Sequence, residues 1–228
     1  MLKQTRLFTV RVWDLPTRLF HWTLLVCVIG LVVTANIGGD AMNWHFRFGY
    51  TVGSLLLFRL IWGVVGGRWS RFVAFIYAPK SVVAYLKGRG RPEHSVGHSP
   101  LGAASVFALL LFLMAQVATG LLSDDEIAAA GPLTRFVSNA TVSLATLYHA
   151  EIGKFILLAL VVLHLAAIIY YTRRKARLVG AMLSGDKHLL LPMPSSRDDA
   201  LTRTLAGFIF AACAGLLYWV SSLAAPGF

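Results

Sequence analysis

Four histidines lie inside apolar stretches of this chain: His21, His45, His149 and His164. A buried imidazole is costly unless it finds a partner, and an ionisable group inside an apolar span is a functional candidate by default. A neutral imidazole can bind a metal ion, and imidazole can also relay a proton near neutral pH. The chemistry predicted for these residues is therefore metal binding or proton transfer within a membrane.

His149 and His164 lie in one membrane-length apolar stretch, residues 148–171. In a regular α-helix, fifteen residues would separate them by roughly 22 Å along the axis and about 60° around it. The two imidazoles would then share one face at two depths. This spacing favours two stacked metal centres inside a helical bundle, and haem iron bound by neutral imidazoles fits it.

Haem binding accounts for the four histidines better than a core role, zinc binding or a proton relay. One apolar histidine could be a satisfied core residue, but four on three helices argue against coincidence. Zinc needs three or four converging ligands, whereas these four separate into two pairs by depth. A proton relay would recruit buried carboxylates, and the spans contain only Glu151, near one end. Two haems, each bound by two histidines, would use all four of these residues. The sequence has no C-x-x-C-H motif, so covalent attachment of haem is not expected.

The composition requires a membrane environment. Hydrophobic residues make up 57% of the 228 residues, charged residues only 14%, and the mean hydropathy is +0.69. The net charge of +11 could suit nucleic acid, but the basic residues lie between apolar runs and carry no recognised motif. Cys27 and Cys213 fall inside apolar spans, so a disulfide framework is not expected. The first apolar run could be a secretory signal, but it is about as long as a full span and is interpreted as a helix.

The hydropathy pattern predicts five membrane-spanning helices, over about residues 19–37, 43–66, 101–122, 148–171 and 205–223. A short interfacial helix is predicted over residues 79–85, and Ser99-Pro100 has the chemistry of a helix start. The predicted fold class is an all-α integral membrane protein, with a four-helix transmembrane bundle holding two haems and a fifth, C-terminal transmembrane helix. Its predicted parts are a cytoplasmic N-terminal segment (1–18), a two-haem domain (19–180), a cytoplasmic linker (181–204) and a C-terminal helix (205–228).

The distribution of lysine and arginine predicts the orientation. Seventeen of the 21 basic residues lie before the first span, between the second and third, or between the fourth and fifth. The loops on the opposite side contain only Arg135, and one of them holds Asp124, Asp125 and Glu126. Cytoplasmic loops are enriched in basic residues, so we expect a cytoplasmic N-terminus and a periplasmic C-terminus.

Five further residues are candidates for contact with a cofactor. Arg59 lies on the helix face of His45 and is predicted to pair with a haem propionate, whereas Arg47, near its helix end, could instead reach the membrane surface. Small residues could leave room for a flat macrocycle or could only permit close helix packing. These are Gly49, Gly53 and Gly153.

The residues resemble the bacterial cytochrome b561 family, which includes the cytochrome b subunits of nickel-iron hydrogenases and is similar to the gamma subunit of formate dehydrogenase. The matching pieces cover about residues 10–180 in family order. They are Trp13-Asp14, Arg18-Leu19-Phe20-His21-Trp22, His45 with Gly49-Tyr50, Phe58-Arg59, Gly97-His98-Ser99-Pro100-Leu101-Gly102, His149 and His164. The fifth span departs from the short family pattern.

The resemblance implies two haem b groups with His21, His45, His149 and His164 as axial ligands. It also implies electron transfer in a bacterial inner membrane, between the quinone pool and a periplasmic partner such as a c-type cytochrome. Two alternative functions stay open: an anchor subunit of a hydrogenase or dehydrogenase complex, and a haem-free proton or metal transporter. The chain could also form a homo-oligomer. Whether the chain is itself a quinone-linked oxidoreductase also stays open.

Depth in the membrane predicts the pairing of the ligands. With the N-terminus cytoplasmic, the second and fourth spans begin on the outer side, so His45 and His149 share a level. His21 and His164 share the cytoplasmic level. If His21 and His149 bound the same iron, that iron would have to span roughly 20 Å of helix length. Metal-to-nitrogen bonds are only about 2 Å long, so this pairing is excluded.

The remaining histidines are assigned to the cytoplasmic side. His98, at the start of the third span, is a candidate for proton delivery to a quinone, because an interfacial histidine can titrate near neutral pH. It could also be a plain interfacial residue. His94 and His188 are predicted to be solvated side chains of polar loops.

Overall fold

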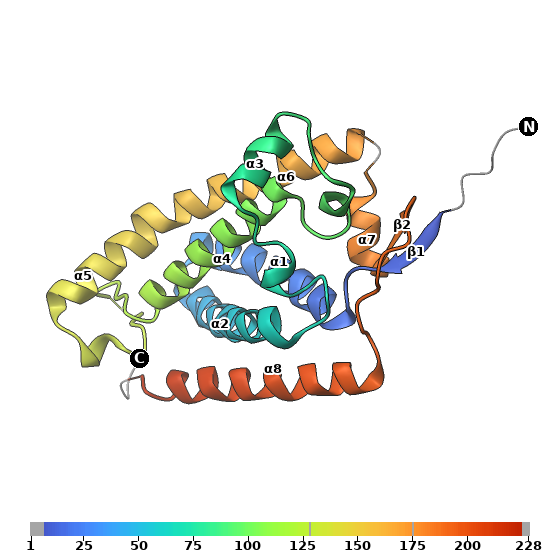
Figure 1. The fold of residues 1–228 in the computed structure, drawn as a ribbon. Helices are drawn as coiled ribbons and strands as arrows, with labels where there is room; N and C mark the ends of the chain where they lie inside the picture. The colour runs from blue at the N-terminus through green and yellow to red at the C-terminus, as the bar shows by residue number, and fades with distance from the viewer. Residues whose placement is uncertain (1–6, 128, 175, 225–228) are drawn as a thin grey trace, which may run out of the picture. The chain divides into compact units, whose positions relative to one another are not determined.

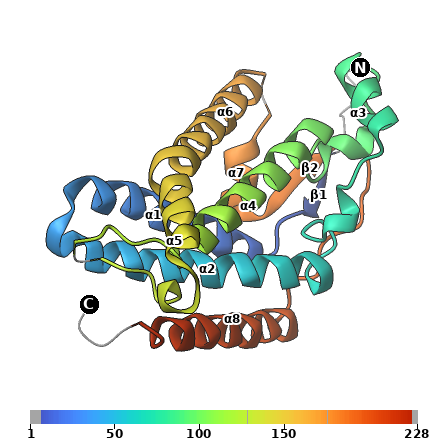
Figure 2. The same cartoon turned by 90° about the vertical axis from the view of Figure 1, so that its left-hand side faces the viewer.

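The computed structural model describes residues 7–127, 129–174 and 176–224. Within these ranges the chain is mostly helical, and the course of each helix can be followed in Figures 1 and 2. The beginning of the predicted N-terminal segment (1–6), Lys175 of the basic cluster after the fourth span, and the last residues of the predicted C-terminal helix part (225–228) lie outside the described residues.

Among the residues that the structure describes, five helices are long and apolar enough to cross a membrane, as predicted. They are α1 (Leu15–Ile37), α2 (Met42–Val65), α4 (Pro100–Gly120), the continuous run of α5 (Asn139–Leu147), a π turn (Tyr148–Gly153) and α6 (Lys154–Arg173), and α8 (Ala200–Ser221). A 3₁₀ turn, Gly39–Ala41, leads into α2. The chain is therefore a multi-pass membrane protein by helix length and composition.

The fourth helix begins nine residues earlier than predicted. Its α5 segment has the sequence NATVSLATL, which is too polar for an apolar window to include. The Ser138 side chain accepts a hydrogen bond from the Thr141 amide at 3.3 Å and caps the helix start. The π turn then interrupts the regular helix between His149 and His164. A π turn holds more residues than an α turn. The predicted angle of about 60° between His149 and His164 assumed a regular α-helix and therefore does not apply.

Short elements lie in the chain segments that flank the spans. They are the 3₁₀ turns Phe72–Ala74, Pro92–Ser95 and Thr134–Phe136, the helices α3 (Pro79–Leu86) and α7 (Leu178–Ser184), and the strands β1 (Phe8–Arg11) and β2 (Asp186–Leu189). Helix α3 confirms the predicted short helix over 79–85. Helix α4 begins at Pro100 as predicted, and the Ser99 hydroxyl accepts a hydrogen bond from the Gly102 amide at 3.2 Å.

The two strands were not predicted. They pair antiparallel, with Val10 opposite Lys187 and Arg11 opposite Asp186. An ion pair of 2.6 Å between Arg11 and Asp186 adds to the strand pairing, and a second one of 2.6 Å joins Arg11 to Asp198. The strand pair therefore joins the predicted N-terminal segment to the predicted linker, although these segments are far apart in sequence.

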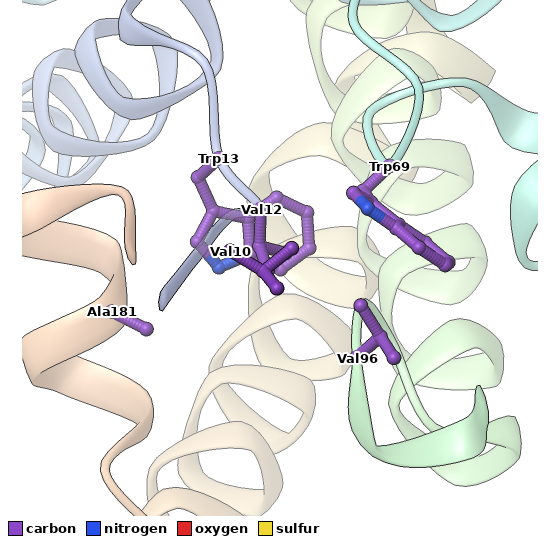
Figure 3. Close-up of a cluster of buried hydrophobic side chains, with 6 residues drawn as sticks. All are labelled: Val10, Val12, Trp13, Trp69, Val96 and Ala181. Atoms are coloured by element: carbon purple, nitrogen blue, oxygen red, sulfur yellow. The ribbon is translucent and has the colours of Figure 1, made fainter. Parts of the chain in front are cut away.

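Contacts divide the chain into two compact units. The first comprises residues 1–20, 59–107 and 163–207, and the second comprises residues 21–58, 108–162 and 208–228. A buried apolar cluster of the first unit includes Val10 of β1 (Figure 3). Its members are Val10, Val12, Trp13, Trp69, Val96 and Ala181.

Candidate functional site

Two of the predicted ligands lie side by side within the second unit. His45 comes from the first turn of α2, and His149 comes from the π turn. Their ring centroids are 6.2 Å apart, and the ring planes are nearly perpendicular at 85°. The structure therefore brings together the pair that the depth argument assigned to the outer level.

Each ring is held through its Nδ1 atom by a backbone carbonyl. The Nδ1 of His45 lies 3.1 Å from the carbonyl oxygen of Leu31, and that of His149 lies 2.9 Å from the carbonyl oxygen of Gln116. A carbonyl oxygen can only accept, so in the neutral rings Nδ1 carries the proton and Nε2 keeps its lone pair. Both imidazoles thus have the tautomer that a metal ion needs at Nε2.

Two residues of α4 shape the surroundings of His149, and neither was predicted from the sequence as part of the site. A side-chain carbon on Gly120 would lie 2.7 Å from Cε1 of the His149 ring, so only glycine leaves room for this ring position. The Gln116 side chain donates a hydrogen bond of 2.8 Å to the His149 carbonyl. The available signal was a single glutamine within an otherwise apolar span that ends on a glycine.

The three candidate glycines have different surroundings. A side-chain carbon on Gly53 would lie 3.1 Å from Leu217 of α8, and one on Gly153 would lie 2.1 Å from the Gln116 side-chain oxygen. These contacts favour close helix packing for both residues. A side-chain carbon on Gly49 would have no atom within 4 Å, so this glycine borders open space.

The two candidate arginines also differ. Arg59 is buried, with 3% of its surface exposed, and its guanidinium carbon lies 4.7 Å from the centre of the Phe72 ring. One of its terminal nitrogens, Nη1, has no hydrogen-bond partner among the described residues. Arg47 is exposed and lies 4.9 Å from the Trp44 ring, as expected of a side chain that reaches the membrane surface.

His21 and His164 are both partly buried. His21 belongs to the second unit, where its ring makes an edge contact with Trp22 at 5.2 Å. His164 belongs to the first unit and lies in α6.

His98 packs between two aromatic rings at the start of α4. Its ring centroid lies 4.4 Å from that of Phe75 and 4.7 Å from that of Trp13. Its backbone carbonyl accepts a hydrogen bond of 2.7 Å from the Tyr77 hydroxyl. This histidine is thus held in place at the end of a spanning helix.

The prediction that His94 is solvated was wrong. It is 8% exposed and makes edge contacts with the rings of Tyr77 and Tyr85. Its Nδ1 also accepts a hydrogen bond from the Arg91 amide at 3.2 Å. The charged neighbours in sequence suggested a polar loop, but the loop folds back on aromatic residues. His188 is exposed as predicted, although it lies in β2 rather than in a loop.

The carboxylates are distributed differently from the sequence expectation. Glu151 is exposed and lies 3.7 Å from the amine of Lys154. Asp14, just before α1, is a fully buried carboxylate. It accepts hydrogen bonds from the Thr17 amide at 2.8 Å, the Gly67 amide at 3.0 Å and the Ser70 hydroxyl at 2.9 Å. Asp14 therefore joins the start of α1 to the turn that follows α2.

The chain is similar in sequence to known proteins. Residues 12–185 match the family described as prokaryotic cytochrome b561. The chain is similar to the probable Ni/Fe-hydrogenase 1 B-type cytochrome subunit of Escherichia coli (strain K12), with 27% identity covering 50% of this chain and 60% of the relative. It is also similar to the probable Ni/Fe-hydrogenase B-type cytochrome subunit of Rhodobacter capsulatus, with 26% identity covering 78% of this chain and 81% of that protein.

The chain spans about three fifths of the length of the first of these relatives. No solved structure matches it significantly. The family match extends over most of the chain and contains His21, His45, His149 and His164. This chain belongs to the prokaryotic cytochrome b561 family, and membership of this family implies haem b.

Proposed function

We propose that the chain passes electrons across a bacterial inner membrane through two haem b groups, each bound by two histidines, between the quinone pool and a periplasmic redox partner. The observation that carries the proposal is the geometry of His45 and His149. We assign them to the outer haem, and His21 and His164 to the cytoplasmic one. In this assignment residues 19–180 form the two-haem domain, and the N-terminal segment and the linker 181–204 are cytoplasmic.

His45 and His149 would together hold one iron. An imidazole nitrogen binds a metal at about 2 Å, so two rings on opposite sides of one ion have centroids roughly 6 Å apart once the ring radii are added. The observed separation is 6.2 Å. The carbonyls of Leu31 and Gln116 supply the partners that orient ligating histidines.

The assignment of His21 and His164 to one haem rests on their depths in the membrane and on the position of Arg59. His21 lies in the second turn of α1, and His164 lies in the second half of α6, fifteen residues after His149. Arg59 lies near the end of α2, fourteen residues after His45, which places it roughly 21 Å along the helix from the outer pair. The buried Arg59 guanidinium has a terminal nitrogen without a hydrogen-bond partner among the described residues, and this nitrogen could donate to a carboxylate such as a haem propionate. We assign Arg47 and Gly49 to the surroundings of the outer pair.

Haem b, when bound, supplies one-electron exchange at its iron. The protein would hold each iron through the Nε2 atoms of two histidines, would keep those atoms unprotonated, and would surround the site with apolar helices. At the cytoplasmic side we assign proton delivery for quinone reduction to His98, because it lies at the end of a spanning helix and imidazole titrates near neutral pH.

A second candidate function is that of a membrane anchor in a hydrogenase complex. Relatives from Escherichia coli and Rhodobacter capsulatus are named as B-type cytochrome subunits of Ni/Fe-hydrogenases, and this favours it. The haems and their ligands would be the same. Only the outer partner would differ, and copurification of hydrogenase subunits from native membranes would identify it. The haem-free transporter has no support from the family.

Spectra of four histidine variants test the haem assignment. His45→Ala and His149→Ala should each remove one and the same component of the low-spin b-type spectrum, and His21→Ala and His164→Ala should remove the other. The exposed His188→Ala serves as a control and should keep both components. Acidified acetone should extract two haems per chain from the unaltered protein. Loss of the same component in the His21 and His45 variants would overturn the pairing.

A further inference from the structure

A hollow of about 400 Å³ lies on helix α3, outside the proposed haem sites. It is open to the surface and is lined by Pro79, Lys80, Val83, Ala84, Lys87 and Arg89. We propose that this hollow binds one anionic phospholipid, with its acyl chains against the apolar wall and its phosphate at the three cations. The proposal needs only that the chain spans a membrane, and it is independent of the haem assignments.

The location of α3 puts the hollow at the membrane surface. The helix lies between α2 and α4 in sequence, so both of its ends lead to the same side of the membrane. The hydroxyl of Tyr85 in α3 lies 3.2 Å from that of Tyr171, two residues before the end of α6. Tyrosines gather at the boundary between lipid and water, because their rings are apolar and their hydroxyls are polar. We therefore place α3 at the depth of the lipid headgroups.

The two sides of α3 differ in what they contact. Tyr85 points toward the protein, where its ring makes an edge contact with His94 at 5.8 Å between centroids. In a regular helix, Val83 and Lys87 lie roughly 160° from Tyr85, on the opposite side. Val83 is 49% exposed and Leu86 is 62% exposed. An outward helix side that combines exposed apolar residues with lysines is typical of a helix lying in the membrane surface.

The end of α3 brings the third cation to the hollow. Gly88 has a positive φ of 74°, and its amide bonds to the Tyr85 carbonyl at 3.0 Å. The Arg89 amide bonds back to the Ala84 carbonyl at 2.9 Å. This pair of hydrogen bonds is a Schellman motif, which reverses the chain and satisfies the last carbonyls of the helix. Arg89 thus returns to the wall that carries Lys80 and Lys87.

The charges of the hollow are uncompensated. Lys80, Lys87 and Arg89 are exposed, and the described residues contain no carboxylate within ion-pair distance of any of them. Three cations at the rim select an anion, while Pro79, Val83 and Ala84 provide an apolar wall. A ligand that has both an anionic head and apolar chains, and that reaches this depth from within the membrane, is a phospholipid.

Native mass spectrometry of the full-length protein in a neutral detergent can test the site. The probes are phosphatidylglycerol and phosphatidylcholine with identical acyl chains. Wild-type protein should retain phosphatidylglycerol in preference to phosphatidylcholine. The variant K80Q/K87Q/R89Q should bind phosphatidylglycerol on the order of 100-fold more weakly, because each of the three cations near an anionic headgroup contributes about a factor of five.

Two further variants separate the site from general charge attraction. R68Q/R173Q/R177Q removes the same charge from exposed residues outside the hollow and should bind phosphatidylglycerol like the wild type. Val83→Trp fills the hollow without changing charge and should weaken lipid binding. All variants should keep the wild-type haem spectrum, which shows that they are folded.

Four results would overturn the proposal. The first is equal retention of both lipids, and the second is an equal loss of binding in the R68Q/R173Q/R177Q control. The third is displacement of the lipid by millimolar inorganic phosphate together with no effect of Val83→Trp, which would indicate a site for free phosphate. The fourth is a photo-crosslinker at position 83 that captures a protein instead of lipid in native membranes, which would indicate a docking site for a subunit.

Discussion

The imidazole rings of His45 and His149 lie 6.2 Å apart, and each is tied through Nδ1 to the backbone of a further helix. For His45 this helix is α1, and for His149 it is α4. Backbone carbonyls cannot rotate away as side chains can, so both rings are oriented before any metal arrives. Four segments of the second unit thus contribute to one pair of ligands.

The contact between Gly120 and His149 can be tested by adding one carbon. Gly120→Ala should displace the His149 ring, because the new carbon would lie 2.7 Å from it. Loss of ring orientation should weaken haem binding at this site roughly 10- to 100-fold, as for other residues that orient metal ligands. Haem titration of the purified protein, followed by its visible spectrum, measures the effect.

Gly207→Ala is the matched control for this substitution. Gly207 lies in α8, and nothing is within 4 Å of the added carbon. Its variant should bind both haems normally. Normal haem binding by Gly120→Ala would show that the ring can shift without losing the iron.

Arg59 should influence the potential of one haem. Arg59→Gln removes a buried positive charge, and a positive charge near a haem favours the reduced, less positive state. The midpoint potential of one component should therefore fall, by roughly 60 mV if the interaction is worth a factor of ten. A spectroelectrochemical titration measures both components. Arg47→Gln removes an exposed charge and should cause a smaller shift.

His98 can be tested by separating quinone turnover from haem content. His98→Ala should slow quinone-linked electron transfer, because the proposed proton donor is gone, while both haem components stay in the spectrum. The defect should be larger at higher pH, where water supplies fewer protons. His188→Ala is the control, because His188 is exposed and lies in β2. If His98→Ala loses a haem component instead, the proton-delivery role is wrong.

Lys187 should make stability depend on pH. Its amine donates a hydrogen bond of 2.7 Å to the Val96 carbonyl, and burial lowers its pKa from 10.5 to about 8. Between these two values the unfolded chain binds more protons than the folded one at this residue, so its contribution to stability rises with pH from about 8 to 10.5. Thermal unfolding at several pH values should show this rise, and Lys187→Met should remove it. The exposed Lys80→Met should keep it.

The number of membrane spans and the histidines within them could be predicted from the sequence alone. Helices that cross a membrane need about 20 apolar residues, so hydropathy reveals them without any knowledge of packing. The short helix that begins at Pro79 and the helix start at Ser99-Pro100 were also predicted from local features, because a proline in the first turn and a capping serine both act within a few residues. His21, His45, His149 and His164 were noticed because ionisable residues are rare within apolar spans.

Tertiary structure decided what depends on residues far apart in the chain. No local pattern shows that Gly120 makes room for His149, because the two are 29 positions apart and meet only when α4 packs beside the π turn. The same holds for β1 and β2, whose four-residue strands are too short to be recognised alone. Asp14 reads as a helix cap in sequence, and only the fold surrounds it with donors from beyond α2, because a buried carboxylate must gather hydrogen bonds from wherever the chain brings them.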